Sequence, residues 1–200
     1  MSVQPQKQNQ LISEEDYLKN ELVSEIKHEY IDGYVYDMAG ASDNHNKIST
    51  NVLMELKSSL KKKGSACVAY MADMRLKQSS KYYYPDVMVI CSEDDKDKYN
   101  KTVPVILVEV LSATTRRKDL TIKRFFYQNI PSLQEYVIIE QDHAEIQVCR
   151  RKDHWQSYYY YLGEEIIFES IGVTVSVEDI YYQVETADVL EYLQSKSQTP

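Results

Sequence analysis

The sequence is poor in cysteine, glycine and proline. Its 200 residues include five glycines, five prolines and only three cysteines, Cys67, Cys91 and Cys149. The cysteines are odd in number and lack the C-x-x-C spacing of zinc or redox motifs, which predicts reduced thiols in a cytoplasmic protein. Because no segment is rich in glycine, proline or serine, the sequence offers no linker that would divide it into domains.

Long hydrophobic runs are also missing. None approaches the roughly 20 apolar residues that a helix needs to cross a bilayer, so we expect no membrane partner. The first ten residues, MSVQPQKQNQ, are too polar for a signal peptide and are expected to be disordered. A chain of 200 residues is long enough to bury a core of its own as one domain.

The sequence also contains fewer basic than acidic residues. The chain has 23 Lys and Arg against 31 Asp and Glu, a net charge of −8. Phosphate contacts depend on Lys and Arg, so this balance argues against a general binder of polyanions. Two basic segments, SLKKKG and TTRRKDLTIKR, nevertheless leave nucleic acid open as a partner. The sequence also lacks the G-x-S-x-G, P-loop and H-E-x-x-H motifs of other enzyme classes.

Hydrophobic periodicity predicts alternating helices and strands. Helices are expected at 13–28, 42–63 and 116–130, with short helical turns at 176–182 and 187–194. A hairpin is expected around Asp32-Gly33, and further strands near 66–77, 82–91, 104–112, 134–140, 144–150, 154–162 and 165–169. The segment 104–140 reads as strand–helix–strand, and a right-handed crossover would make its two strands parallel. The sequence therefore predicts an α/β fold with a mixed sheet flanked by helices.

Two carboxylates lie in or beside strands that should be buried. Asp86 follows Pro85 and precedes the apolar run 87–90, and Glu109 lies within PVILVEVLS. Burying an unpaired carboxylate costs several kcal/mol, about 2–7 or more for polar groups without a partner. If the two strands are neighbours, the carboxylates converge at one sheet edge, where Mg²⁺ would relieve their burial. Alternatively, each acid lies in solvent or pairs with a buried Lys or Arg.

Asp119 and Lys123 are four residues apart on the following helix and share a face. They form either an ordinary surface ion pair or a pair directed at the sheet edge. In the second arrangement the Lys123 ammonium would lie beside an attacking water and stabilise the charge of phosphoryl transfer.

Asp86, Glu109 and Lys123, in this order, resemble the PD-(D/E)XK nuclease superfamily. A longer succession of motifs resembles its Uma-two family of restriction endonucleases. These motifs are EIKHEYIDGYVYDMAGAS, HNKIS, YYYPDVMVI, LVEVLS, KDLTIKRFFYQ and SLQEYVIIEQD. The resemblance covers a single nuclease-like domain at 13–182, with terminal extensions at 1–12 and 186–200. It departs from the superfamily at Leu111, where the usual lysine two residues after the glutamate is missing. In the Uma-two branch the lysine has moved to the next helix, which Lys123 matches.

The resemblance implies a restriction-endonuclease-like fold with additional C-terminal strands and a Mg²⁺- or Mn²⁺-dependent endonuclease that cleaves nucleic acid, most readily DNA. It implies Asp86, Glu109 and the carbonyl of Val110 as metal ligands and Lys123 as the catalytic cation. It also implies that Glu29, at the end of the first helix, lies near the metal and assists catalysis. Alternatively, Glu29 is an ordinary solvated acid at the helix end.

Several points stay open at this stage. The roles of His45, Asp73, Asp119 and Gln128 are not assigned, and Asp73 could equally pair with Arg75 or Lys77. The tyrosine run 158–161 offers a surface for a possible homodimer, with alternate side chains exposed. The alternative function is a catalytically inactive module that keeps the nuclease fold and binds nucleic acid or protein.

Overall fold

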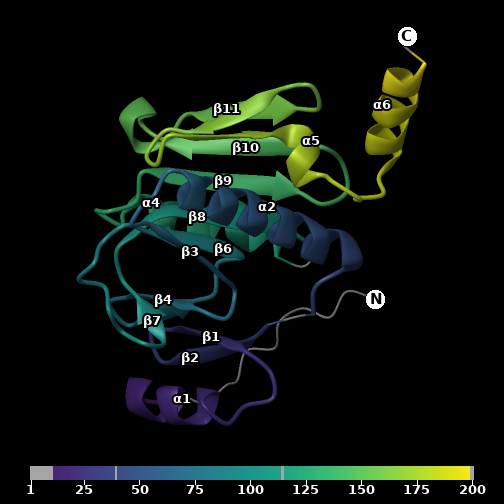
Figure 1. Ribbon diagram of the computed structural model, residues 1–200. Helices are drawn as coiled ribbons and strands as arrows, with labels where there is room; N and C mark the ends of the chain where they lie inside the picture. The colour runs from purple at the N-terminus through teal and green to yellow at the C-terminus, as the bar shows by residue number, and fades with distance from the viewer. Residues whose placement is uncertain (1–10, 39, 114, 199–200) are drawn as a thin grey trace.

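The computed structural model describes residues 11–38, 40–113 and 115–198 of the chain (Figure 1). The expected disorder of the first ten residues lies outside this part. Within the described part, no helix combines the length and the apolar character that crossing a membrane would require.

A six-stranded mixed sheet forms the centre of the fold. Strands β8 and β9 run parallel, as the strand–helix–strand pattern predicts, and the other neighbouring pairs are antiparallel. In spatial order the strands are β11 (Ser157–Tyr161), β10 (Glu145–Arg150), β9 (Glu135–Glu140), β8 (Pro104–Leu111), β6 (Val87–Ile90) and β3 (Val68–Met71). The α/β fold with a mixed sheet is therefore confirmed.

A second sheet lies below the first in Figure 1 and contains the predicted hairpin. Its strands, in spatial order, are β2 (Tyr34–Asp37), β1 (His28–Ile31), β5 (Lys81–Tyr83), β4 (Arg75–Gln78) and β7 (Asn100–Lys101). A separate C-terminal pair consists of β12 (Glu165–Phe168) and β13 (Val173–Ser176). These strands supply the additional C-terminal β-structure that the family resemblance implies.

Helices cover the central sheet on both faces. The helices of the described chain are α1 (Glu14–Glu21), which packs against the second sheet, α2 (Asp43–Lys62), α3 (Arg116–Lys118), the π-helix η1 (Asp119–Lys123), α4 (Arg124–Gln128), the short 3₁₀ turn η2 (Arg151–Asp153), α5 (Val177–Ile180) and α6 (Ala187–Ser197). Helix α2 lies across β3, β6 and β8 (Figure 1). On the opposite face, Tyr127 of α4 packs with Leu107 and Tyr136 of the sheet and with Tyr83 of the second sheet.

Helix α2 forms as its sequence predicts. The Ser42 hydroxyl accepts a hydrogen bond from the His45 amide and caps the first turn. The apolar stripe at i, i+4 spacing is fully buried against the central sheet and consists of Ile48, Val52, Leu56 and Leu60. The helix ends just before Gly64, whose positive φ of 62° reverses the chain at little cost.

Three predicted elements are shorter than the sequence suggested. Proline has no N–H to donate to a ladder, and the run 82–91 divides at Pro85 into β5 and β6, which belong to different sheets. The run 66–77 divides at a turn between β3 and β4. The first helix ends at Glu21 instead of 28, because the Glu21 carboxylate binds the amide and ring of His28 and fixes the start of β1.

The expectation of three reduced cysteines is wrong for two of them. Cys67 and Cys91 form a disulfide, with their Cα atoms 4.0 Å apart, and Cys149 is free and buried. The pairing follows from strand register: Val68 lies opposite Ile90 in the β3–β6 ladder, so the flanking cysteines face each other. Sequence spacing cannot reveal this because 24 residues separate the two.

The tyrosine run forms β11, an edge strand of the central sheet. The predicted alternation of exposed and buried side chains is wrong for this strand. Tyr158, Tyr159 and Tyr161 are all exposed by 40% or more, whereas Tyr160 packs against the core and contacts Arg150.

We expect the disulfide to be detectable by thiol titration. Protein denatured without reductant should show one reactive thiol per chain, from Cys149, because the other two are linked. After reduction, all three cysteines should react. Closing such a loop stabilises a domain by about 2–4 kcal/mol, so reduction should also lower the unfolding midpoint. Three reactive thiols before reduction would contradict the pairing.

Candidate active site

Asp86 and Glu109 lie at the same end of two neighbouring strands. Strands β6 and β8 pair with Val87 opposite Val108, which places Asp86 and Glu109 at the next position along the ladder. The Val110 amide donates a hydrogen bond of 2.7 Å to Asp86 Oδ2. The predicted convergence at one sheet edge is thus present, and Glu109 is only 3% exposed.

Lys123 is buried against this edge. Its Nζ lies 3.0 Å from Glu109 Oε1, 3.1 Å from Asp119 Oδ1 and 3.1 Å from Glu29 Oε1. Asp119 and Lys123 are 1% and 5% exposed, so the surface-pair alternative is wrong. Both residues belong to the π-helix η1, an element that occurs in short stretches and often at functional sites.

Glu29 reaches the cluster from the second sheet. It belongs to strand β1 and is 4% exposed, so its expected place at the end of a helix is wrong, as is the alternative of a solvated acid. Its carboxylate pairs with both Lys118 and Lys123. The side chain therefore joins the two sheets to the helical segment after β8.

Two further side chains contact the predicted pair. His45, on the first turn of α2, places Nε2 3.2 Å from Asp86 Oδ2. Tyr127 of α4 is fully buried and donates a 2.9 Å hydrogen bond to Glu109 Oε1. Sequence reasoning left His45 unassigned and missed Tyr127, since its helical spacing resembles an ordinary core position.

The charges of the cluster are tightly coupled. Burial raises the pKa of the Glu109 carboxyl well above its usual range, and nearby Asp119 and Asp86 raise it further. Burial alone would lower the pKa of Lys123, but the carboxylates of Glu109 and Glu29 outweigh it and raise that pKa well above normal. The surrounding carboxylates therefore favour the ammonium form of Lys123.

The pKa values of Glu29 and His45 shift in opposite directions, each because of a neighbour of opposite charge. Burial raises the pKa of Glu29, yet the ammonium groups of Lys123 and Lys118 more than offset this and lower it. Burial lowers the pKa of His45, but its contact with Asp86 outweighs the loss and raises it. In each case a partner of opposite sign shifts the pKa in the direction that favours the charged form.

The residues present fit a hard divalent cation. Four carboxyl groups, those of Glu29, Asp86, Glu109 and Asp119, face three basic side chains, those of Lys118, Lys123 and His45. Asp119 Oδ1 is buried and, within the described chain, makes no hydrogen bond despite its ion pair. Oxygen donors with excess negative charge are what Mg²⁺ and Mn²⁺ prefer.

A cavity of about 980 Å³ opens onto the cluster. It lies between the β1–β2 hairpin on one side and the first turns of α2 with the segment Arg117–Lys123 on the other. Glu29, Asp86, Glu109, Val110 and Lys123 all line it.

Other residues considered from the sequence lie away from this cluster. Asp73 pairs with Lys27, not with Arg75 or Lys77, and its side chain is 72% exposed. Gln128 ends α4 and is not among the described residues that line the cavity.

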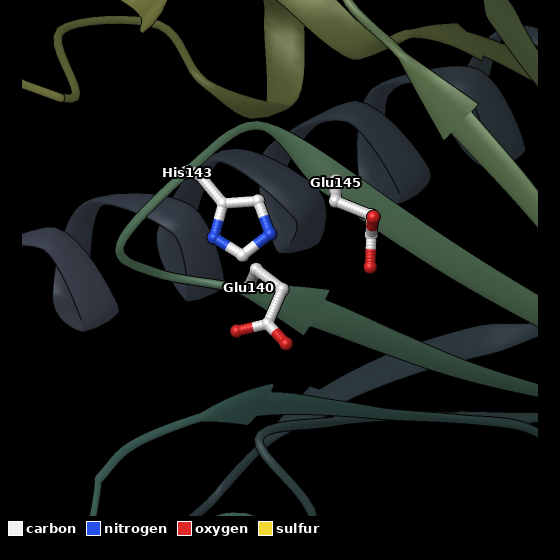
Figure 2. A group of neighbouring side chains, drawn as sticks. All are labelled: Glu140, His143 and Glu145. Atoms are coloured by element: carbon white, nitrogen blue, oxygen red, sulfur yellow. The ribbon is translucent and has the colours of Figure 1, made fainter. Parts of the chain in front are cut away.

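A second acidic group occupies the β9–β10 turn (Figure 2). Among the described residues, Glu140, His143 and Glu145 are the three ligand-type side chains whose donor atoms all lie within 4.8 Å of one another. Both carboxylate oxygens of Glu140, however, accept hydrogen bonds from the Arg116 guanidinium. A cation here would have to displace that ion pair, so the sheet-edge cluster is the better candidate.

Comparison with known proteins places the chain among uncharacterised bacterial relatives. It is 33% identical over 175 residues to "Uncharacterized protein slr1290" of Synechocystis sp., covering 85% of this chain and 91% of that protein. It is 35% identical over 181 residues to "Uncharacterized protein sll1609" of the same organism, covering 87% and 96%.

A solved structure shares the fold. It is titled a "putative nuclease belonging to DUF820" from Anabaena variabilis and superposes with a TM-score of 0.68 at 16% identity. The match covers 81% of this chain and 93% of the other. The model of the Uma2 family, described as "Putative restriction endonuclease", matches residues 14–178. By this match, which spans most of its length, and by its relatives, the chain belongs to the Uma2 family.

Proposed function

We propose that this protein is a Mg²⁺- or Mn²⁺-dependent endonuclease that hydrolyses phosphodiester bonds in DNA. The observation that carries the proposal is the buried Lys123 ammonium, held at a sheet edge by Glu109, Glu29 and Asp119 beside Asp86. A buried cation next to surplus carboxylates is costly as a purely structural device. It is well suited to a reaction in which negative charge grows on a phosphoryl group.

In this proposal, Asp86, Glu109 and the carbonyl of Val110 would hold the cation. When bound, such a cation polarises a phosphoryl oxygen and lowers the pKa of water. Lys123 orients the attacking water and stabilises the charge of the transition state. Glu29 positions Lys123 through an ion pair, and Lys118 in turn holds the Glu29 carboxylate. Tyr127 orients Glu109 through its hydrogen bond.

A single nuclease-like domain is part of this proposal. It spans residues 13–182, with terminal extensions at 1–12 and 186–200. So is a possible homodimer, which would be needed only for cutting both strands of a duplex at one site per chain. The exposed tyrosines of β11 offer a surface for such pairing.

Divalent cations should stabilise the protein. A ligand that binds only the folded state raises the melting temperature, so Mg²⁺ or Mn²⁺ should do so in the wild type, and Asp86→Asn should abolish the rise. Asp94→Asn, an exposed loop acid, is the matched control and should keep it. His143→Ala should also keep it, because that residue belongs to the β9–β10 turn. If His143→Ala removed the rise while Asp86→Asn kept it, the cation would bind at the turn.

Removing the Lys123 ammonium should abolish most activity. Loss of one preorganised charge typically costs about 10²–10³ in rate, so Lys123→Met should cleave plasmid or oligonucleotide DNA that much more slowly with Mn²⁺. Lys57→Met removes the same charge from an exposed position on α2, outside the basic segment SLKKKG, and should leave the rate unchanged. Lys118 is unsuitable as a control because it pairs with Glu29. Equal, measurable rates for wild type and Lys123→Met would refute the catalytic role of Lys123, whereas no cleavage by the wild type would favour the inactive binding module.

The same substitution should destabilise the fold. Removing one partner of a buried ion pair costs about 3–5 kcal/mol, because the other charge is left unpaired. Urea denaturation should show a loss of this size for Lys123→Met. The double variant Lys123→Met/Glu29→Gln should recover part of it, since fewer carboxylates are then left without a cation. A loss below about 0.5 kcal/mol, typical of an exposed pair, would contradict the burial described above. Activity is therefore compared at temperatures where both variants are folded.

A further inference from the structure

The candidate reacting groups lie at the bottom of the cavity. Glu109, Lys123 and Glu29 are each 5% exposed or less, and they are reached through a space of about 980 Å³. That volume is near the upper end of pockets that enclose small ligands, roughly 300–1,000 Å³. It suits a few nucleotides of one strand. A stacked duplex would have to bring its phosphate to the buried carboxylates while its other strand stayed outside.

The charge of the cavity does not favour a duplex. Its lining contains four Lys and Arg side chains, Lys27, Arg117, Lys118 and Lys123, the His45 imidazole paired with Asp86, and four carboxylates, Glu29, Asp37, Asp86 and Glu109. Three of the Lys and Arg side chains are already in ion pairs, and the chain as a whole carries a net charge of −8. Binding along a duplex relies on neutralising many phosphates with Lys and Arg. Among the Lys and Arg side chains of the described lining, only Arg117 forms no ion pair, and it is exposed and available to a neighbouring phosphate.

The rim of the cavity is apolar. Ile26, Met71 and Ile122 are 53%, 49% and 59% exposed, and all three line the cavity together with the ring of Tyr36. The outside of a duplex presents phosphates and sugars, which gain nothing from aliphatic side chains. The bases of an unpaired strand offer flat, weakly polar faces that can stack on the Tyr36 ring and bury apolar surface against the aliphatic side chains. Exposed apolar side chains gathered at a cavity also mark a binding surface more often than an isolated one does.

We propose that the cavity takes an unpaired strand of DNA, with bases against the rim formed by Ile26, Tyr36, Met71 and Ile122 and one phosphate at the Glu109–Lys123 edge. Arg117 serves the adjacent phosphate. The inference rests on the proposed function, because it concerns the substrate of the same site. It also means that one chain is sufficient for cleavage, since only one strand is cut.

Binding tests the strand preference directly. Fluorescence anisotropy of the full chain, with Ca²⁺ in place of Mn²⁺, compares a labelled single-stranded oligodeoxynucleotide with the same oligonucleotide in a duplex. We expect the single strand to bind at least about 10-fold more tightly, as stacking of one or more bases predicts. In Mn²⁺, the unpaired tail of a partial duplex should be cut and its paired part should stay intact. Equal or tighter binding of the duplex would overturn the inference.

Substitutions at the rim test the assigned contacts. The double variant Met71→Ser/Ile122→Ser should lose about 10-fold in affinity for the single strand, because it removes apolar surface that the bases would bury. Ile167→Ser is the matched control: Ile167 is 52% exposed on β12, lies outside the lining of the cavity, and should leave affinity unchanged. Because all three side chains are half exposed or nearly so, melting temperatures should stay close to that of the wild type. Unchanged affinity in the double variant would overturn the assigned rim.

The outcomes separate this inference from the proposed function. Cleavage of duplex as fast as single strand would refute the strand preference and leave the endonuclease proposal standing. Tight, selective binding of the single strand with no cleavage under Mg²⁺ or Mn²⁺ would refute the endonuclease and support the strand site as a binding module. Neither binding preference nor cleavage would refute both.

Discussion

The site depends on one buried cation. Lys123 contacts three carboxylates, and each of these comes from a different element: Glu109 from β8, Glu29 from β1 and Asp119 from η1. A charge that is 5% exposed tolerates its burial only when partners surround it. The ammonium therefore holds the central sheet, the second sheet and the π-helix in one arrangement. Because breaking a buried pair is strongly unfavourable, the elements that form the site are coupled to one another.

Pro85 determines how the two sheets meet at this point. Without an N–H it cannot continue a ladder, and the chain leaves the second sheet after β5 and enters the central sheet at β6. Asp86 lies where the chain passes between the two sheets, and the β6–β8 register places it opposite Glu109. His45, on the first turn of α2, contacts its carboxylate. The break that interrupts a predicted strand is thus the feature that directs a carboxylate into the cavity.

The electrostatics of the cluster explain why a protein with a net charge of −8 can still be proposed to act on nucleic acid. Carboxyl groups outnumber the basic side chains of the cluster, and burial, together with nearby Asp119 and Asp86, raises the pKa of Glu109 well above normal. A divalent cation would offset this excess and place its own positive charge at the bottom of the cavity. Attraction of a phosphate would then come from a local site, without the broad basic surface that duplex binders use.

The sequence by itself determined the local elements and their pairing along the chain. The apolar stripe of α2, its Ser42 cap and the parallel pair β8–β9 follow from periodicity, capping and the handedness of crossovers, which depend on nearby residues. The sequence made the convergence of Asp86 with Glu109 conditional on their strands being neighbours, and the pairing of β6 with β8 meets that condition. β13 was missed although Val173 and Val175 alternate in the manner of a strand, because the run is only four residues long.

Tertiary structure decided the rest of the site. Glu29 joins the cluster only because Glu21 ends the first helix early and sends β1 into a separate sheet. Lys118 pairs with Glu29 across 89 residues, and Cys67 pairs with Cys91 through the register of β3 and β6. Such contacts are set by how sheets pack and which strands become neighbours. Local periodicity carries no information on packing between distant segments, so only the folded chain could bring these side chains together.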